Sequence, residues 1–327
     1  MKGERMRRLL IIDALNLFIR NYIVNPTIST NGNPIGGSVG FLNSLRKLMR
    51  EAKPDGVVIC WDGAGGSRKR RTMVKEYKEG RKPLRKNYKI DGMTEQSEKE
   101  NMVWQQRTLI EMLNQMPIVQ LVINEVEADD IIAMISKSPK YKGWQKVIVS
   151  SDKDFIQLLD DETVLYRPIQ KVAWNKNMVI SEYNISPENF VLARAIAGDK
   201  SDNLRGIKGA GLTTISKRIP FLNEDKMYTL DEVYNHCAQA DSKLKFYCNV
   251  VEDWDTVETN YKVMNLTPPS ISVQGKQKIN YTLDNFEYEL NATELRKISV
   301  QKGFGSYDWS EITVMLRRIV MENKQTV

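Results

Sequence analysis

The 327-residue sequence predicts an α/β fold in which a mainly parallel central sheet is flanked by helices. Three observations lead to this prediction: four continuous apolar runs have the length of buried strands, helical patterns separate them, and each run leads into carboxylates. Continuous apolar runs are typical of parallel strands, because helices cover both faces of a parallel sheet and leave neither face to polar side chains.

The predicted strands follow one another in the first half of the chain, at residues 9–12, 57–61, 118–123 and 147–149. Apolar residues with helical spacing lie between them at residues 37–50 and 97–116. Ser97 and Glu100 have the spacing of a capping box, so the second of these helices is expected to begin at Ser97.

The remaining chain predicts mainly helices, at residues 183–199, 213–218 and 231–251 and from Trp309 onward, with a polar stretch near residues 268–275. We therefore expect two regions. Residues 1–182 form an α/β domain, interrupted at about residues 68–101 by a polar, lysine- and arginine-rich excursion, and residues 183–327 form a second, helical region.

Composition excludes several classes of protein. No run of 18 apolar residues is present, so no membrane span is expected, and the apolar stretch at residues 9–12 is too short for a signal peptide. Three cysteines without metal-ligand spacing and a single histidine argue against a disulfide scaffold, a zinc site and a histidine-rich metal site. We therefore expect a cytoplasmic protein.

Positive charge is concentrated in one segment. The chain has 48 basic and 41 acidic residues, and eleven basic residues against two acidic ones lie between Arg68 and Lys89. This local surplus exceeds the net charge of the whole chain and favours an acidic partner such as nucleic acid. Tyr77 and Tyr88 lie among the lysines, where stacking on bases would add to phosphate attraction. The alternative is a solvated charge run in a loop.

Nine carboxylates lie just after the predicted strands or ahead of a glycine-rich stretch: Asp13, Asp62, Glu127, Asp129, Asp130, Asp152, Asp154, Asp199 and Asp202. Because the carboxyl ends of parallel strands meet at one rim, we expect these side chains to converge. Without cations they would repel one another. We predict two Mg²⁺ ions, replaceable by Mn²⁺, of which one activates a water and the other stabilises a leaving oxygen. The alternative is a set of ordinary loop caps that pair with surface lysines.

The glycine-rich stretch at residues 206–211 precedes the helix expected at residues 213–218. Backbone N–H groups ahead of a helix N-terminus bind phosphate readily. The stretch lacks the Gly-Lys-Ser/Thr ending of a P-loop, so we expect contact with a duplex backbone rather than with a nucleotide triphosphate. The alternative is a plain loop.

Taken in order, three acidic motifs and the glycine stretch resemble the 5′-nuclease superfamily. They are Glu-Ala-Asp-Asp at residues 127–130, Ser-Asp-Lys-Asp at 151–154, Gly-Asp-Lys-Ser-Asp-Asn at 198–203 and Gly-Ile-Lys-Gly at 206–209. The superfamily includes phage-type 5′→3′ exonucleases of the ribonuclease H type, flap endonucleases and the 5′-nuclease domains of bacterial polymerase I. The resemblance covers residues 9–218.

The resemblance implies a role for each acidic residue. The first metal site would be formed by Asp13, Asp62, Glu127, Asp129 and Asp152. The second metal site would be formed by Asp154, Asp199 and Asp202, with Asp130 between the two sets as a catalytic residue.

The resemblance also implies that the excursion at residues 68–101 is a helical arch that captures a 5′ single strand. Lys78 would contact the scissile phosphate, with Arg81 beside it. Residues 206–214 match the helix–three-turn–helix element that grips a duplex, for which a monovalent cation site is implied. The nucleic-acid-binding residues expected on this basis are Arg20, Arg70, Arg71, Tyr77, Gly206, Lys208, Gly209, Gly211 and Thr213.

The function implied is a Mg²⁺-dependent 5′→3′ exonuclease and flap endonuclease acting on branched or 5′-ended DNA and RNA–DNA duplexes, with removal of RNA primers in DNA replication as its task. A monomer in the cytoplasm of a bacterium or phage-infected host is expected, with a single-strand-binding protein or sliding clamp as partner and no membrane association. Two alternatives stay open: a non-catalytic, structure-specific DNA-binding protein and a toxin-type metal-dependent ribonuclease.

Overall fold

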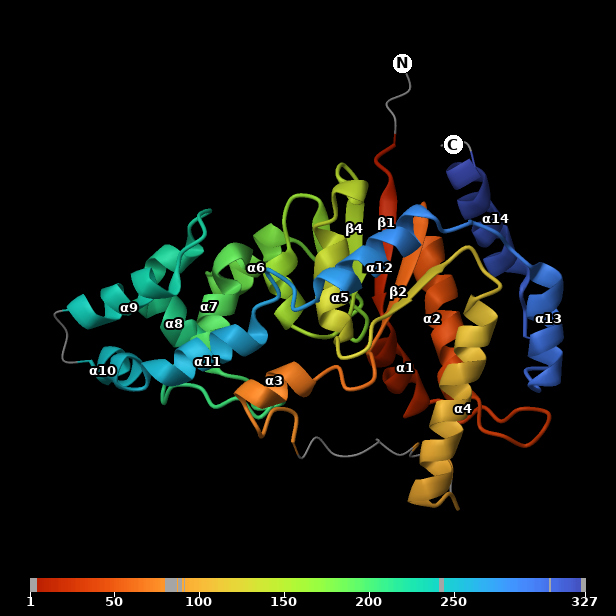
Figure 1. Cartoon of the computed structure of the whole chain (residues 1–327), viewed down its shortest axis with the longest axis horizontal. Coiled ribbons are helices and arrows are strands. Elements are labelled where there is room, and N and C mark those ends of the chain that lie inside the picture. The colour runs from red at the N-terminus through yellow and green to blue at the C-terminus, as the bar shows by residue number, and fades with distance from the viewer. Residues whose placement is uncertain are drawn as a thin grey trace.

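The computed structural model describes residues 5–79, 87, 90, 92–240, 244–305 and 307–324. Within these residues, six strands form one sheet in the order β3-β2-β1-β4-β5-β6, in which β5 and β6 are antiparallel and every other pair is parallel. The strands are β1 (Arg8–Asp13), β2 (Gly56–Trp61), β3 (Val119–Val122), β4 (Gln145–Val149), β5 (Thr163–Arg167) and β6 (Val172–Trp174). The predicted α/β fold is therefore confirmed, and the four predicted strands correspond to β1–β4 (Figure 1).

The side chains of β1 show why its sequence is apolar throughout. Leu9 and Ile11 belong to one hydrophobic cluster, whereas Leu10 and Ile12 belong to another on the opposite face of the sheet. All four are at most 1% exposed, and burying an aliphatic side chain of this size stabilises a protein by about 1.5–3 kcal/mol. Both faces of the central strand are therefore covered, as expected for a parallel sheet.

Different helices cover the two faces. The second cluster packs under α1 (Ala14–Tyr22), α2 (Gly36–Ala52), α4 (Glu95–Leu113), α13 (Ala292–Gln301) and α14 (Ser310–Lys324). The first cluster includes α5 (Ala128–Ser136), η2 (Asp154–Leu158), α7 (Pro187–Ala197) and α12 (Val273–Asp284). Figure 1 shows these two groups on either side of β1 and β2.

The remaining helices extend from the first face. They are α3 (Arg68–Met73), η1 (Pro139–Tyr141), α6 (Lys176–Tyr183), α8 (Leu212–Arg218), η3 (Pro220–Asn223), α9 (Leu230–Gln239), α10 (Lys245–Glu252) and α11 (Trp254–Met264). In Figure 1, α8–α11 gather beside α7 at the end of the molecule opposite α13, and α3 lies next to α11. The chain then returns through α12 to α13 and α14, whose Leu295, Ile312 and Leu316 complete the second cluster.

Several predicted helix boundaries were wrong. Thr94, not Ser97, caps α4, because its hydroxyl accepts a hydrogen bond from the Ser97 N–H at 3.1 Å, so the Ser97–Glu100 capping box is not the start of this helix. The helix predicted at residues 183–199 was placed too early at its start: α6 ends at Tyr183, Asn184 follows it with a left-handed φ of 52°, and Pro187 starts α7. Asn in this conformation and Pro in the first turn are common helix boundaries.

The helix predicted at residues 231–251 is two helices, α9 and α10. The prediction also missed α6, α11, α12 and α13, and it missed β5 and β6. Of the excursion predicted at residues 68–101, the described part includes α3, the turns up to residue 79 and the start of α4, whereas Arg81 lies outside the described residues. Across the described ranges, no helix is both long and apolar enough to cross a membrane.

Candidate active site

Three neighbouring parallel strands bring acidic side chains to one rim of the sheet. Asp13 is the last residue of β1, Asp62 follows β2 directly, and Asp152 comes three residues after β4. Ser150 holds two of these acids, because its hydroxyl donates to Asp13 Oδ2 at 2.8 Å and accepts from the Asp152 N–H at 3.1 Å. Asp13 also caps α1 through the Asn16 N–H at 3.2 Å.

Asp129, in the first turn of α5, joins these three side chains. The start of α5 is fixed to the rim, because Asp62 Oδ1 accepts a hydrogen bond from the Ala128 N–H at 2.9 Å. We call Asp13, Asp62, Asp129 and Asp152 the central acidic group. In the part of the chain that the structure describes, none of the four has a Lys or Arg nitrogen within ion-pair distance.

The electrostatics of the central acidic group reflect burial and crowding. Burial, reinforced by Asp62, raises the pKa of Asp13 to about 7. Burial also raises the pKa of Asp129 well above its usual value, against the opposing effect of Lys78, and burial raises the pKa of Asp152. The protein therefore holds carboxylates that are difficult to ionise together, a situation that a bound cation relieves.

The described part of the predicted arch, up to residue 79, places cations on two further acids. Arg70 Nη1 donates to Glu127 Oε2 at 2.6 Å and to Asp130 Oδ2 at 2.8 Å, and Lys78 Nζ donates to Glu127 Oε1 at 2.7 Å. Tyr77 completes this contact through its hydroxyl, 3.3 Å from Glu127 Oε2. Burial alone would raise the pKa of Glu127, but Lys78 and Arg70 outweigh it and keep the pKa below its usual value. We call Arg70, Tyr77 and Lys78 the arch base.

Asp130 is fully occupied by protein groups. Its Oδ2 accepts from Arg70, and its Oδ1 accepts from the Ser270 N–H at 2.7 Å, in the segment between α11 and α12. The residue is 1% exposed. The predicted catalytic role of Asp130 therefore finds no free carboxylate oxygen in this structure, and Asp130 instead ties the arch base to the C-terminal part of the chain.

The second acidic group, Asp154, Asp199 and Asp202, contains a cation that the sequence reasoning missed. The guanidinium of Arg194 lies 3.1 Å from Asp154 Oδ1 and also hydrogen-bonds Asp199 Oδ2. Burial and the neighbouring Asp152 raise the pKa of Asp154 to about 7 despite Arg194, whereas Ser201 and Arg194 outweigh burial and lower the pKa of Asp199. The sequence did contain one indication of this contact: Arg194 lies five residues before Asp199, near the end of a predicted helix.

The acids differ in exposure: Asp13 and Asp202 are buried, Asp129, Asp152, Asp154 and Asp199 are half-buried, and Asp62 is exposed. The space bordered by Arg70, Tyr77, Asp129, Asp154 and Asp202 has a volume of only about 10 Å³, roughly the minimum that holds one water. Within the described ranges, no three Asp, Glu, His or Cys side chains are grouped as a ready-made metal cage. The predicted assignment of acids to two metal sites therefore stays a prediction.

The predicted nucleic-acid contacts divide into exposed and buried residues. Arg71, Lys208, Gly209, Gly211 and Thr213 are exposed, and Arg20 and Gly206 are half-buried. Arg70 and Tyr77 are buried instead, at 6% and 4% exposed, and they face carboxylates, so their predicted contact with nucleic acid stays a prediction. Their basic and aromatic character serves to neutralise and cover Glu127.

The glycine stretch requires glycine at Gly206. A Cβ at this position would lie 1.9 Å from the carbonyl oxygen of Ala197, whereas a Cβ at Gly211 would meet nothing within 4 Å. Gly211 precedes α8 directly, so the loop approaches α7 closely at one end and starts a helix at the other.

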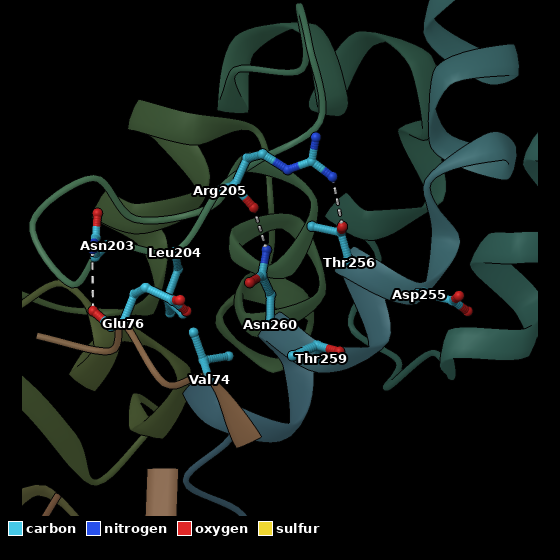
Figure 2. Close-up of a pocket in the computed structure, with 9 residues that line it drawn as sticks. All are labelled: Val74, Glu76, Asn203, Leu204, Arg205, Asp255, Thr256, Thr259 and Asn260. Carbon is cyan, nitrogen blue, oxygen red and sulfur yellow. Dashed lines mark hydrogen bonds between the residues drawn. The ribbon is translucent and has the colours of Figure 1, made fainter. Parts of the chain in front are cut away.

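A pocket of about 390 Å³ lies where Val74 and Glu76, in the segment after α3, meet residues 203–205 and α11. Figure 2 shows how these segments are joined: Asn203 Nδ2 donates to the carbonyl of Glu76 at 3.2 Å, and Asn260 Nδ2 donates to the carbonyl of Arg205 at 2.8 Å. The Lys78 N–H also donates to the carbonyl of Asp202 at 3.0 Å. The arch base is thus attached to the loop that carries the second acidic group.

Comparison with known proteins agrees with this arrangement. Residues 8–184 match the family model of the 5′-3′ exonuclease N-terminal resolvase-like domain. The 5′-3′ exonuclease of Aquifex aeolicus strain VF5 is 29% identical over 210 residues, which make up 64% of this chain and 68% of that protein. The thermostable DNA polymerase I of Thermus thermophilus is 28% identical over 247 residues, 74% of this chain. The matched part spans only 27% of that polymerase.

Solved structures share the fold. T5 5′-exonuclease with bound zinc ions has a TM-score of 0.69 at 19% identity, covering 86% of this chain and 99% of that one. The T5 D15 flap endonuclease, in a pseudo-enzyme–product complex with DNA and metal ions, has a TM-score of 0.63 at 19% identity. The match covers 90% of this chain and 97% of that one. Because the family model matches more than half of the sequence, from β1 through α6, this chain belongs to the 5′-3′ exonuclease family.

Proposed function

We propose that this protein is a divalent-cation-dependent 5′-nuclease that hydrolyses phosphodiesters at 5′ ends and flaps of DNA and RNA–DNA duplexes. The observation that carries the proposal is the central acidic group. Three strand ends and the first turn of α5 bring together Asp13, Asp62, Asp129 and Asp152, and no described cation is paired with them. Keeping four carboxylates close together without a paired cation costs folding free energy. A function in binding cations explains why the protein keeps this arrangement.

The donor set suits Mg²⁺. The ion prefers carboxylate and water oxygens, and the group offers carboxylates without histidine or thiolate. When bound, such ions lower the pKa of a water and stabilise the charge on the phosphate and on the leaving oxygen. We propose Mg²⁺, with Mn²⁺ as a substitute, held first by the central acidic group, with a second ion near Asp154, Asp199 and Asp202.

The residues around the acids would bind and position the substrate. Lys78 lies at the edge of the acids with its ammonium 2.7 Å from Glu127, from which it can move to a phosphate oxygen that arrives there. The exposed Lys208 and Gly209 ahead of α8, and Thr213 in its first turn, present a positive charge and backbone N–H groups, which suits a phosphate backbone. We propose that residues 206–214 grip the duplex, together with a monovalent cation, and that Arg20 and Arg71 contact the nucleic acid.

The relatives support the proposed substrate. A solved relative is a flap endonuclease in complex with DNA and metal ions, and the Aquifex relative is named a 5′-3′ exonuclease. Extending both properties to this chain gives a structure-selective enzyme, because contacts with the phosphate backbone carry no sequence information. We propose RNA primer removal in DNA replication as its task, and a single-strand-binding protein or sliding clamp as its partner.

The division of labour follows the predicted regions. We propose that residues 1–182, with the arch, supply most of the catalytic acids, and that residues 183–327 supply the duplex grip together with Asp199 and Asp202 of the second acidic group. The protein would act as a monomer in the cytoplasm of a bacterium or phage-infected cell.

A cleavage assay distinguishes this function from the two alternatives. A DNA substrate with a labelled 5′ flap is incubated with the protein in Mg²⁺ and, separately, in EDTA, beside the same strands with RNA at the 5′ end. Cleavage near the flap junction that requires Mg²⁺ is expected. Binding without cleavage in Mg²⁺ would indicate the non-catalytic DNA-binding protein, and cleavage only of single-stranded RNA would indicate the toxin-type ribonuclease.

A further inference from the structure

Arg194 forms an unusual contact for a residue beside an acidic site. It lies in the last turn of α7, and its Nε and Nη2 are each 3.1 Å from Asp154 Oδ1. Nη2 also hydrogen-bonds Asp199 Oδ2, and Nη1 donates to the carbonyl of Gly198 at 3.2 Å. One guanidinium thus connects an acid that follows β4 with an acid that follows α7.

This contact is built into the fold. The side chains of Arg194, Asp154 and Asp199 are 13%, 18% and 17% exposed, so water screens their charges only weakly. Arginine keeps its proton in proteins, and its planar fork fixes the positions of the oxygens that it bonds. The second acidic group therefore contains a permanent positive charge at a defined place.

The central acidic group differs in this respect. Its four carboxylates have no Lys or Arg nitrogen within ion-pair distance in the described ranges, although Asp152 is close enough to Asp154 to raise the pKa of that residue. Of two neighbouring groups of acids, one thus has a cation ion-paired within it, whereas Lys78 acts on Asp129 of the other from beyond ion-pair distance and is paired with Glu127. A divalent cation entering the second group would be repelled by Arg194 and would have to compete with it for Asp154 and Asp199.

We propose that Arg194 is a positioning residue that serves as the resident counter-cation of the second acidic group. Without nucleic acid, the chain then takes up one divalent cation with high affinity, at the central acidic group, and a second one at least about ten-fold more weakly. This inference rests on the proposed function, because it assumes that the acids bind metal ions, but it concerns the number of ions and not the reaction.

The test counts bound metal ions directly. Mn²⁺ is titrated into the metal-free, nucleic-acid-free full-length protein, and free Mn²⁺ is measured by electron paramagnetic resonance, with calorimetry for affinity. Wild type should bind one tight equivalent. Arg194→Met should gain a second, bound at least ten-fold more tightly than any second equivalent of wild type, and Arg194→Lys should behave like wild type.

Arg205→Met is the matched control. Arg205 is also paired with a carboxylate, Asp253, but its side chain is 72% exposed and it contacts none of the nine acids. The substitution removes the same charge from the protein but leaves the acidic groups unchanged. The Mn²⁺ binding of Arg205→Met should therefore equal that of wild type. If Arg205→Met gained a second tightly bound Mn²⁺ as Arg194→Met does, the net charge of the protein alone would set the affinity for the second ion. That result would overturn the proposal.

Wild type alone also decides the question if Arg194→Met does not fold. Two equivalents that bind wild type with affinities within about three-fold of each other overturn the proposal, as does an Arg194→Met titration that matches wild type. If these results accompany Mg²⁺-dependent flap cleavage, the proposed function stands and only this inference fails. If wild type binds no Mn²⁺ and cleaves no flap, the proposed function fails with it.

Discussion

The guanidinium of Arg70 lies between Glu127 and Asp130, with Nη1 at 2.6 Å and 2.8 Å from the two carboxylates. Its Nε donates to the carbonyl of Val263, at the end of α11, at 2.9 Å. One side chain from α3 therefore joins the arch, the first turn of α5 and the C-terminal helices. These segments are distant in the sequence, and Arg70 holds them together through its contacts. The position of the arch base therefore depends on Arg70.

Arg70→Met should destabilise the protein by about 3–5 kcal/mol, because it leaves two buried carboxylates without their cation. Arg71→Met is the matched control: Arg71 is the next residue and is exposed, so its free energy of unfolding should change by less than about 0.5 kcal/mol. Urea denaturation followed by circular dichroism measures both. Equal stabilities of the two variants would show that Arg70 is not needed to hold the arch base.

Gly206→Ala should destabilise the fold, since its Cβ would lie 1.9 Å from a backbone carbonyl that cannot move independently of α7. We expect a loss of more than about 2 kcal/mol, in line with other overpacked positions. Gly211→Ala, in the same loop but with open space around its Cβ, should change stability by less than about 1 kcal/mol. Thermal melting of both variants makes the comparison, and a similar melting temperature for the two would contradict the close approach of this loop to α7.

Lys78→Ala should lower the rate of cleavage more than it weakens duplex binding, because Lys78 borders the acids and not the predicted duplex grip. Lys75→Ala removes the same charge from the same segment at an exposed position and should change the rate little. Single-turnover cleavage of a 5′ flap gives the rate, and fluorescence anisotropy in Ca²⁺ gives the affinity. If the two variants cleave equally fast, Lys78 has no part in the reaction.

The stability of the metal-free protein should fall as pH rises from about 4 to about 7. Asp13 and Asp154 have a pKa of about 7 in the folded protein and about 4 when unfolded, so the folded state binds more protons in this interval. Mg²⁺ competes with those protons. It should therefore raise the melting temperature more at pH 8 than at pH 5, measured against KCl of equal ionic strength. Equal increments at the two pH values would mean that these acids do not bind the ion.

The sequence predicted the parts of the fold that depend on local pattern. The strand at residues 9–12 was recognisable because both of its faces are buried, and the meeting of Asp13, Asp62 and Asp152 followed from parallel topology. The strand β5 was missed because it mixes Thr163, Tyr166 and Arg167 with apolar residues and lies near the edge of the sheet. Its continuous apolar run is only Val164 and Leu165, too short to stand out, although Thr and Tyr also favour strands.

The ion pairs within the site could not be predicted in the same way. Arg70 was expected to bind nucleic acid because it lies in a basic run, yet its partners Glu127 and Asp130 are 57 and 60 residues away along the chain. Charge alone does not distinguish an arginine that faces solvent from one that neutralises buried acids. For Arg194 the partner Asp154 follows a strand, and only tertiary packing brings α7 beside it.

The most direct test of the central claim is the cleavage rate of Asp152→Asn. The substitution keeps the shape of the side chain but removes one negative charge from the central acidic group. Single-turnover cleavage of a labelled 5′ flap in Mg²⁺ is compared with that of Asp161→Asn, an exposed acid two residues before β5, and binding is measured in Ca²⁺. We expect Asp152→Asn to lose at least about a thousand-fold in rate while its affinity stays within a few-fold of wild type. A rate equal to that of Asp161→Asn would contradict the account.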